Sequence, residues 1–222
     1  EFDYVRSRRE RVLTRRFADK GFLVLFWADA GWVRYFMRRP AVHPDDFKRL
    51  KIFVTAGDNA QYDLMRSGGF SPVSLEWSDA LTSLQTGMID AVPTIPYFAL
   101  AMQFHTVASS MLEINWLPLV GATIISKRSW DALSPESQAA MRSAAADAGR
   151  RFQERGRAES DEAVAAMRQR GLTVIPAPPA IEAEWRAMSE RLYPQIRGGM
   201  VPADMFDEVV RVLAEYRAAR RP

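Results

Sequence analysis

The sequence predicts an α/β fold, and two observations carry that prediction. Between residues 51 and 92, three short apolar runs typical of strands alternate with two amphipathic helical stretches, a spacing that favours βαβ units and a largely parallel sheet. Residues 135–170 form one uninterrupted helical pattern, which corresponds to roughly 50 Å at 1.5 Å per residue. A helix of that length is expected to span two lobes.

The N-terminal segment predicts a helix, a strand and a turn. Residues 3–20 have a helical pattern that ends at Gly21, a residue type that commonly ends helices. The continuous apolar run 22–27 suits a strand that is buried on both faces, and residues 28–32 are expected to turn the chain at its carboxyl end. Because ligand sites of open α/β sheets gather at such ends, this turn is expected beside the site.

The middle of the chain carries the most regular pattern. The segment His43-Pro44-Asp45-Asp46 predicts a helix start, with acids in the first turn where the helix dipole favours them. Strands are expected at residues 51–54, 72–75 and 88–92, and helices at residues 59–67, which Gly68-Gly69 follows, and 78–86.

The C-terminal half is expected to be mainly helical. Residues 94–104 predict a helix, and two separate strands are expected at residues 111–114 and 120–125. Ser134-Pro135-Glu136 predicts the start of the long helix, because Ser is favoured at the N-cap and Pro at the first helical position. A strand at residues 172–175 and helices at residues 183–193 and 204–218 complete the prediction.

Composition excludes several kinds of site. The 222 residues contain no cysteine, which excludes a disulfide scaffold, a thiolate zinc site and a cysteine nucleophile. No apolar run reaches the ~18 residues that a membrane span needs. The chain opens on Glu1-Phe2-Asp3-Tyr4 and shows no signal peptide, so an exported protein would be represented here after processing or truncation.

Positive charge gathers near the N-terminus, although the formal net charge is only +3. The arginines concerned are Arg6, Arg8, Arg9, Arg11, Arg15 and Arg16. Such a cluster can neutralise nucleic-acid phosphates, or it can form a solvated helix face that Glu10 and Asp19 share. Since no nucleic-acid-binding motif follows it, we favour the solvated face and expect no nucleic-acid partner.

Catalytic and metal-binding patterns find no support. A hydrolase needs a nucleophile beside a base, yet the sequence has no G-x-S-x-G elbow and no phosphate-binding glycine loop. His43 and His105 stand alone, without the spacing of a zinc site, and we interpret both as structural. Asp90 is interpreted as a hydrogen-bonding residue rather than a general base. We therefore expect no enzyme, no cofactor and no metal.

Aromatic side chains form the most suggestive set. They lie at predicted strand ends or in the segments that follow, and they are Trp27, Trp32, Trp77, Trp116, Tyr97 and Phe98. Large flat side chains with a polar edge suit the lining of a small-molecule cleft. They also fill the cores of α/β proteins, so both interpretations stay open from the residues alone.

Several short sequence motifs, taken in their order along the chain, resemble those of a known family. They are Asp29-Ala30-Gly31-Trp32, Pro44-Asp45-Asp46-Phe47-Lys48-Arg49-Leu50-Lys51-Ile52, Ser71-Pro72-Val73, Trp77-Ser78-Asp79-Ala80-Leu81, Leu84-Gln85-Thr86-Gly87-Met88-Ile89-Asp90-Ala91 and Ser126-Lys127-Arg128-Ser129-Trp130-Asp131-Ala132-Leu133-Ser134. No single phrase is specific, but their order and spacing resemble the DctP-like periplasmic receptors of tripartite ATP-independent periplasmic (TRAP) transporters. The resemblance covers about half of the chain.

This resemblance implies a two-lobed fold of the periplasmic-binding-protein type II kind, with a long inter-lobe helix. Family members are longer at the N-terminus, so the first lobe is expected to be incomplete. Residues 1–40 would then belong to lobe 1 and residues 41–125 mainly to lobe 2. Residues 126–222 would supply the spanning helix and C-terminal helices that pack on both lobes. Such a receptor captures a small organic ligand in the periplasm and delivers it to the membrane subunits of a TRAP transporter, without catalysis.

Two departures from the family pattern concern the ligand. In the family pattern, the residues that correspond to Lys51-Ile52 are followed by an arginine, which pairs with a substrate carboxylate. In this sequence Phe53 stands at that position, and Thr94 corresponds to an asparagine of the family. We hypothesise that the ligand is more apolar than a C4-dicarboxylate, or that its acid group is held elsewhere. Arg34 is the nearest charged candidate, although a surface position is the favoured interpretation for it.

The expected ligand-binding residues follow from the resemblance and the aromatic set. They are Trp32, Phe53, Trp77, Thr94, Tyr97 and Trp116. Trp32 and Trp116 are expected to wall the ligand, Phe53 and Trp77 to supply the face of the second lobe, and Thr94 and Tyr97 to donate hydroxyl hydrogen bonds.

Two other classes of function stay open. An effector-binding domain of a transcription regulator shares the two-lobed α/β architecture, but it would need a DNA-binding helix-turn-helix upstream. A small-molecule enzyme on the same fold would need paired titratable groups, which the sequence does not show.

Overall fold

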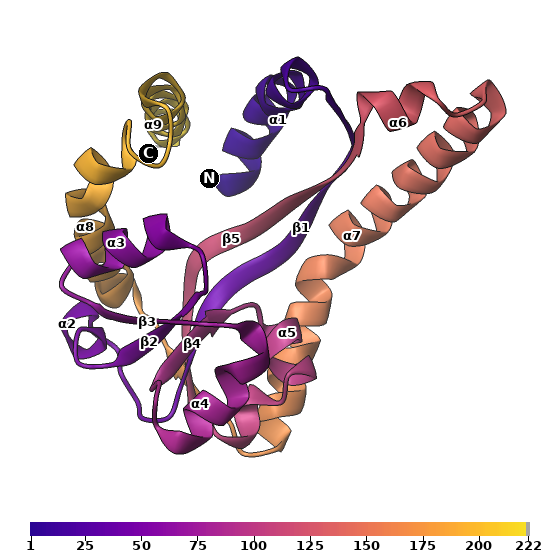
Figure 1. Ribbon diagram of the computed structural model, residues 1–222. Coiled ribbons are helices and arrows are strands. Elements are labelled where there is room, and N and C mark those ends of the chain that lie inside the picture. The colour runs from indigo at the N-terminus through magenta and orange to yellow at the C-terminus, as the bar shows by residue number, and fades with distance from the viewer. Residues whose placement is uncertain (221–222) are drawn as a thin grey trace. The chain divides into compact units, whose positions relative to one another are not determined.

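The computed structural model describes residues 1–220, apart from the side chain of Gln153, and it contains one sheet with helices packed on it (Figure 1). Within these residues the sheet has six strands in the order β3-β2-β4-β1-β5-β6. Their bounds are Phe22–Met37 (β1), Lys51–Thr55 (β2), Ser71–Leu75 (β3), Ala91–Thr94 (β4), Ser110–Ser126 (β5) and Thr173–Pro176 (β6). Strand β2 runs parallel to β3 and β4, and β5 runs parallel to β6, whereas β1 and β4 are antiparallel. The α/β prediction is confirmed, with a mixed sheet.

Most helices begin and end within a few residues of their predicted bounds, but α6 was not predicted and α8 begins at Pro179, before the predicted residue 183. Their bounds are Phe2–Asp19 (α1), Pro44–Phe47 (α2), Asn59–Ser67 (α3), Ala80–Thr86 (α4), Pro96–Ala101 (α5), Lys127–Asp131 (α6), Pro135–Gln169 (α7), Pro179–Ile196 (α8) and Ala203–Ala218 (α9), with short 3-10 turns at Trp77–Asp79 (η1) and Phe104–Thr106 (η2). The Ser134 hydroxyl accepts a hydrogen bond from the N–H of Ser137 at 3.2 Å, which is the N-cap expected for the long helix.

The predicted turn at residues 28–32 is wrong, because β1 continues through it to Met37. Burial alternates along this stretch, with Asp29, Gly31, Val33 and Tyr35 on the buried side. The N–H of Gly31 donates to the Asp29 carboxylate at 2.9 Å, and Gly31 has a φ of +95°. A local side-chain bond and one unusual backbone angle therefore fit inside the strand without turning the chain.

Three other strand predictions need correction. The run at residues 22–27 is not buried on both faces, since Phe22 is 38% exposed. The two strands predicted near residues 111–114 and 120–125 are one strand, β5. Strand β4 begins at Ala91, later than the predicted 88, because Gly87 ends α4 with a φ of +76°.

The described chain divides into two compact units. Unit 1 consists of Glu1–Gly31, Pro118–Ala158 and the described part of Asp204–Pro222, and unit 2 consists of Trp32–Leu117 and Glu159–Ala203. Helix α7 contributes residues to both units, as expected for an inter-lobe helix. The assignment of residues 1–40, 41–125 and 126–222 to the lobes of a receptor stays a prediction.

In unit 1, buried charge attaches α7 to β1. The Asp29 carboxylate is almost fully buried and accepts hydrogen bonds from Arg157 at 2.7 and 3.2 Å. Arg157 also holds Asp3 of α1, at 2.6 and 3.1 Å, and this hydrogen bond lowers the pKa of Asp3. Arg6 completes the network at 3.4 Å from Asp29. Several donors around one buried carboxylate compensate the cost of its burial.

In unit 2, helices cover both faces of the sheet. Helices α2, α3 and α8 pack on one face, and α4, α5 and α7 pack on the other (Figure 1). The first face carries the tryptophan cluster, defined as Tyr35, Phe47, Trp116 and Trp185. The second carries the phenylalanine cluster, defined as Phe36, Phe53, Phe98 and Phe104. Neighbouring residues such as Tyr35 and Phe36 enter different clusters because side chains alternate along a strand.

Trp185 is the centre of the tryptophan cluster. Its side chain is 2% exposed and contacts Tyr35, Phe47 and Trp116, with ring centroids 4.8–5.6 Å apart. Its Nε1 donates a hydrogen bond to the Val42 carbonyl at 2.8 Å.

Replacement of Trp185 by Ala is expected to lower the free energy of unfolding by about 3–5 kcal/mol, measured by urea denaturation. The control is Tyr97→Ala, at a side chain 55% exposed in the same unit, with an expected change of about 0.5 kcal/mol or less. Equal losses in the two variants would contradict the central role of Trp185.

Candidate ligand-binding face

A polar row crosses three adjacent strands of unit 2. Thr94 of β4 and Arg34 of β1 are direct partners in the sheet register, and Nη1 of Arg34 lies 3.5 Å from Oε1 of Glu113 on β5. We call Thr94, Arg34 and Glu113 the polar row. Because Arg34 and Phe36 are two residues apart on one strand, the row lies on the same sheet face as the phenylalanine cluster.

Arg34 is largely buried and incompletely paired. Its side chain is 12% exposed, and its Nε, which is buried, has no hydrogen-bond partner among the described residues. Leaving a buried donor unpaired costs about 1–3 kcal/mol. The guanidinium also carries a charge that Glu113, whose side chain is 47% exposed, balances only at long distance. This group can therefore take up an anionic acceptor such as a carboxylate.

The surface interpretation of Arg34 is wrong. Arg34 lies near the carboxyl end of β1, which runs between two neighbouring strands, whereas the sequence alone placed it near a turn. One signal could have found it, since Arg34 stands at the alternate position between Trp32 and Phe36 in a run that is otherwise apolar.

Aromatic rings continue the face beside the polar row. The Trp77 ring lies against Phe53, with centroids 4.3 Å apart, and meets Phe98 edge-on at 5.1 Å. Trp77 and Phe98 are partly buried, whereas Phe53 is 1% exposed. The ring that replaces the family arginine is thus a core residue that supports Trp77. A ligand contact by Phe53 stays a prediction.

The other predicted residues of this face differ in exposure. Trp32 stands on β1 two residues before Arg34, so it shares the face of the polar row. Thr94 is buried at 7% exposure, and Tyr97, in the first turn of α5, is 55% exposed. The structure therefore brings Trp32, Trp77 and Thr94 to the face that carries Arg34, and their contacts with a ligand stay predictions.

Trp116 lies on the opposite face of the sheet. It packs in the tryptophan cluster, 5.0 Å from the Trp185 ring and 5.9 Å from the Tyr35 ring. Within unit 2 the structure does not bring Trp116 together with Phe53 and Trp77. The sequence placed Trp116 in a connection between two short strands, but it is inside β5, where alternation fixes the face to which it points.

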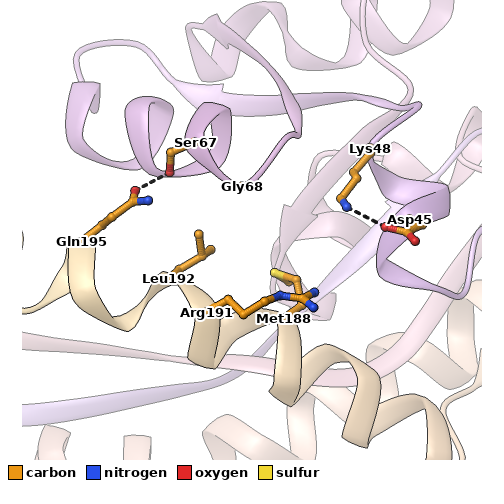
Figure 2. Close-up of a pocket in the computed structure, with 8 residues that line it drawn as sticks. All are labelled: Asp45, Lys48, Ser67, Gly68, Met188, Arg191, Leu192 and Gln195. Carbon is orange, nitrogen blue, oxygen red and sulfur yellow. Dashed lines mark hydrogen bonds and ion pairs between the residues drawn. The ribbon is translucent and has the colours of Figure 1, made fainter.

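A separate pocket of about 360 Å³ opens on the side of the tryptophan cluster. Figure 2 shows its lining, which comes from α2, α3, α8 and the residues that follow α2 and α3: Asp45, Lys48, Ser67, Gly68, Met188, Arg191, Leu192 and Gln195. Nζ of Lys48 lies 2.6 Å from Oδ1 of Asp45, and this bond lowers the pKa of Asp45. Ser67 donates to Gln195. Lys48 and Ser67 thus already have partners, and Arg191, the remaining charged side chain of the lining, is exposed to solvent. The pocket therefore offers a charged solute less than the largely buried Arg34 does.

The two histidines lie outside the polar row. Nδ1 of His43 is 2.7 Å from Oε2 of Glu184, so the residue joins the start of α2 to α8. Burial lowers the pKa of His105, whose Nδ1 has no hydrogen-bond partner in the described chain. Among residues 1–220, no group of three or more His, Asp or Glu side chains could hold a metal ion, and no helix is both long and apolar enough to cross a membrane.

The fold of this chain is that of the TRAP-type periplasmic solute-binding proteins. A receptor of Shewanella oneidensis with bound succinate matches 95% of the chain with a TM-score of 0.84 at 20% identity, and 70% of its own chain is covered. The Bordetella pertussis receptor DctP7, which binds pyroglutamic acid, matches 95% with a TM-score of 0.82 at 19% identity, over 68% of its own chain. The predicted two-lobed α/β fold class is confirmed by these similarities.

The chain belongs to the bacterial extracellular solute-binding protein family 7, whose DctP model matches residues 3–198. The C4-dicarboxylate-binding periplasmic protein DctP of Rhodobacter capsulatus is 24% identical over 73% of this chain and 49% of its own length. The 2,3-diketo-L-gulonate-binding periplasmic protein YiaO of Escherichia coli K12 is 28% identical over 80% of this chain and 53% of its own length. The chain thus spans about half the length of the curated relatives that it matches.

The pair of His43 and Glu184 predicts a pH dependence. The hydrogen bond to Glu184 raises the pKa of His43, so its stabilising contribution is complete below the unfolded pKa of about 6.5. That contribution is lost as the pH rises through the higher folded pKa. In Glu184→Gln, the pKa of His43 is expected to fall, as measured by NMR titration. Glu184→Gln is expected to be less stable than wild type at mildly acidic pH, and this difference should vanish at alkaline pH. Glu190→Gln, on an exposed part of α8, is the matched control, and an equal fall of the His43 pKa in both variants would contradict the pairing.

Proposed function

We propose that the chain is the ligand-binding part of an extracytoplasmic receptor, which captures a small organic acid in the periplasm and delivers it to the membrane subunits of a TRAP transporter. Membership of the solute-binding family supports this proposal. So do relatives whose names specify a C4-dicarboxylate or a sugar acid, and similar folds with succinate or pyroglutamic acid bound. The observation that carries it is the buried, incompletely paired guanidinium of Arg34.

Arg34 would hold the carboxylate of the ligand. A guanidinium presents its N–H donors in a planar fork that matches the two oxygens of a carboxylate. Arg34 stands between Thr94 and Glu113, so the hydroxyl of Thr94 would add a hydrogen bond and Glu113 would orient the fork. Because the side chain is only 12% exposed, water competes weakly for its donors, and the interaction is stronger than on an open surface.

The rest of the ligand would face aromatic rings. Trp32 and Trp77 offer flat apolar surfaces on the same face, and Tyr97 offers an exposed phenol. Phe53 removes the cation that the family pattern has at its position, so one carboxylate fewer can be paired there. We therefore propose a ligand more apolar than a C4-dicarboxylate, with a single acid group at Arg34.

Arg34→Gln is expected to weaken binding of the acid ligand. Loss of a charged partner at a buried pair costs about 2–5 kcal/mol, which corresponds to a roughly 30-fold or larger rise in Kd. Arg34→Lys keeps the charge but loses the fork, so its Kd is expected to lie between wild type and Arg34→Gln. Isothermal titration calorimetry with pyroglutamate, succinate and malate measures the effect and tests whether the monocarboxylate is preferred.

The control for charge is Arg49→Gln, at an exposed position. It should leave the Kd unchanged. Tight binding of succinate that survives Arg34→Gln but is lost on substitution of another arginine would contradict both the role of Arg34 and the more apolar ligand.

The two tryptophans on opposite faces should separate affinity from stability. Trp77→Ala removes a ring from the proposed ligand face, and a roughly tenfold rise in Kd is expected. Trp116→Ala removes a ring from the tryptophan cluster, so unit 2 should lose about 2 kcal/mol of stability with the Kd within about twofold of wild type. Calorimetry and urea denaturation of the same samples give both quantities. A larger affinity loss in Trp116→Ala than in Trp77→Ala would refute the assignment of faces.

A further inference from the structure

A second polar pocket lies at the other end of β4. It has a volume of about 660 Å³, and its lining includes Arg38, Arg39, Gln85 and Asp90. Thr94 of the polar row ends β4, whereas Asp90 immediately precedes the strand. The two are four residues apart, or roughly 13 Å in an extended strand. The pocket is therefore separate from the proposed ligand face.

The two arginines of this pocket retain unused donors. Nη1 of Arg38 lies 3.9 Å and Nη2 of Arg39 lies 3.7 Å from Oδ1 of Asp90, both longer than a hydrogen bond. Neither guanidinium makes a side-chain hydrogen bond within the described residues. Each guanidinium has five N–H donors, so the pair can bind several oxygens at once.

The carboxylate and the backbone groups of Asp90 already make hydrogen bonds with backbone groups of Lys51 and Arg38. Its Oδ2 accepts from the N–H of Lys51 at 3.0 Å, its own N–H donates to the Lys51 carbonyl at 2.7 Å, and its carbonyl accepts from the N–H of Arg38 at 2.9 Å. The sequence interpretation of Asp90 as a hydrogen-bonding residue is confirmed. Its role here is to fix the positions from which Arg38 and Lys51 project.

The local fold makes room for the Arg38 side chain. A Cβ added to Gly87 would stand 2.5 Å from Nη1 of Arg38, and Gly87 has a φ of +76°. Glycine at this helix end therefore allows the left-handed backbone conformation and also leaves room for the close approach of the guanidinium. Nζ of Lys51 donates to the carbonyl of the same Gly87, so a third cation stands near the first.

We propose that Arg38, Arg39 and Lys51 form a binding site for a doubly charged oxyanion of the phosphate class. Asp90 balances one of the three cations, which leaves two positive charges for the ligand. Planar forks bind phosphate oxygens in pairs, and the Gln85 amide of the lining adds a neutral donor. The phosphate group can belong to a free anion or to a monoester lipid headgroup such as that of phosphatidic acid, since both present three terminal oxygens and can carry two charges.

The test compares Arg38→Gln/Arg39→Gln with a control of equal charge, Arg49→Gln/Arg66→Gln, at exposed positions of the same unit. The wild-type protein and the two variants are titrated with inorganic phosphate by calorimetry. They are also sedimented with phosphatidylcholine vesicles that contain or lack phosphatidic acid. About 0.15 M salt suppresses long-range attraction. Circular dichroism melting verifies that both variants fold.

The expected result is a roughly tenfold or larger loss of affinity in the Arg38/Arg39 variant, with no loss in the control. Loss of phosphate binding identifies a free anion as a ligand, and loss of binding only to phosphatidic acid vesicles identifies a headgroup. Equal binding by the two variants, or no binding of either probe to the wild-type protein, would overturn the site. The calorimetric test of Arg34 is independent of these outcomes.

Discussion

Alternation of side chains along β1 constrains most of unit 2. This strand lies inside the sheet between β4 and β5, so its successive residues must point to opposite faces. Tyr35 enters the tryptophan cluster, Phe36 enters the phenylalanine cluster, and Arg34 joins Thr94 and Glu113. A slip of one residue would exchange these environments and bury the guanidinium among tryptophan rings. The two hydrophobic clusters and the polar row are therefore fixed together.

The cost of burying charge explains why so few charged groups lie inside this molecule and why the buried carboxylates have defined partners. Asp29 in unit 1 accepts from Arg157 and from the backbone of Gly31, and Asp90 in unit 2 accepts from the backbone of Lys51. Both are satisfied within their own unit. Arg9 and Arg34 differ, since each has a buried Nε without a partner among the described residues. Arg9 has a close carboxylate partner, Glu208 at 2.5 Å, whereas the carboxylate of Glu113 lies 3.5 Å from Arg34. A buried guanidinium with one unpaired donor and only a loosely placed carboxylate partner is what distinguishes Arg34, as a candidate for ligand recognition, from the closely paired structural charges.

Local patterns determined what the sequence could predict. Helix α3 and the start of α7 were predicted correctly because caps and apolar periodicity are encoded within a few residues. The extension of β1 through residues 28–32 was missed because pairing with strands distant in sequence outweighs the turn propensity of Asp29 and Gly31. For the candidate site, the aromatic residues of the sequence correctly suggested that Trp77 lies beside the sheet face that carries the polar row. They could not show that Trp116 lies on the opposite face of the sheet. The apolar residues around Arg34 could have indicated its burial, but its partner in the sheet, Thr94, stands sixty residues later in the chain, and no spacing rule reveals such a partner.

Unit 1 is built from segments that are far apart in the sequence, and this affects how it can form during biosynthesis. Its three segments are separated by the segments of unit 2, and α1 of the first segment is held by α9 of the last. Tyr4 packs on Tyr216 with ring centroids 4.9 Å apart, and Arg16 pairs with Asp204 at 2.8 Å. Contacts between α1 and α9 cannot form until synthesis reaches residue 204 and beyond, and long loops must close to make them. Unit 1 is therefore expected to complete its native contacts late, with the arginine-rich α1 unassembled in the meantime.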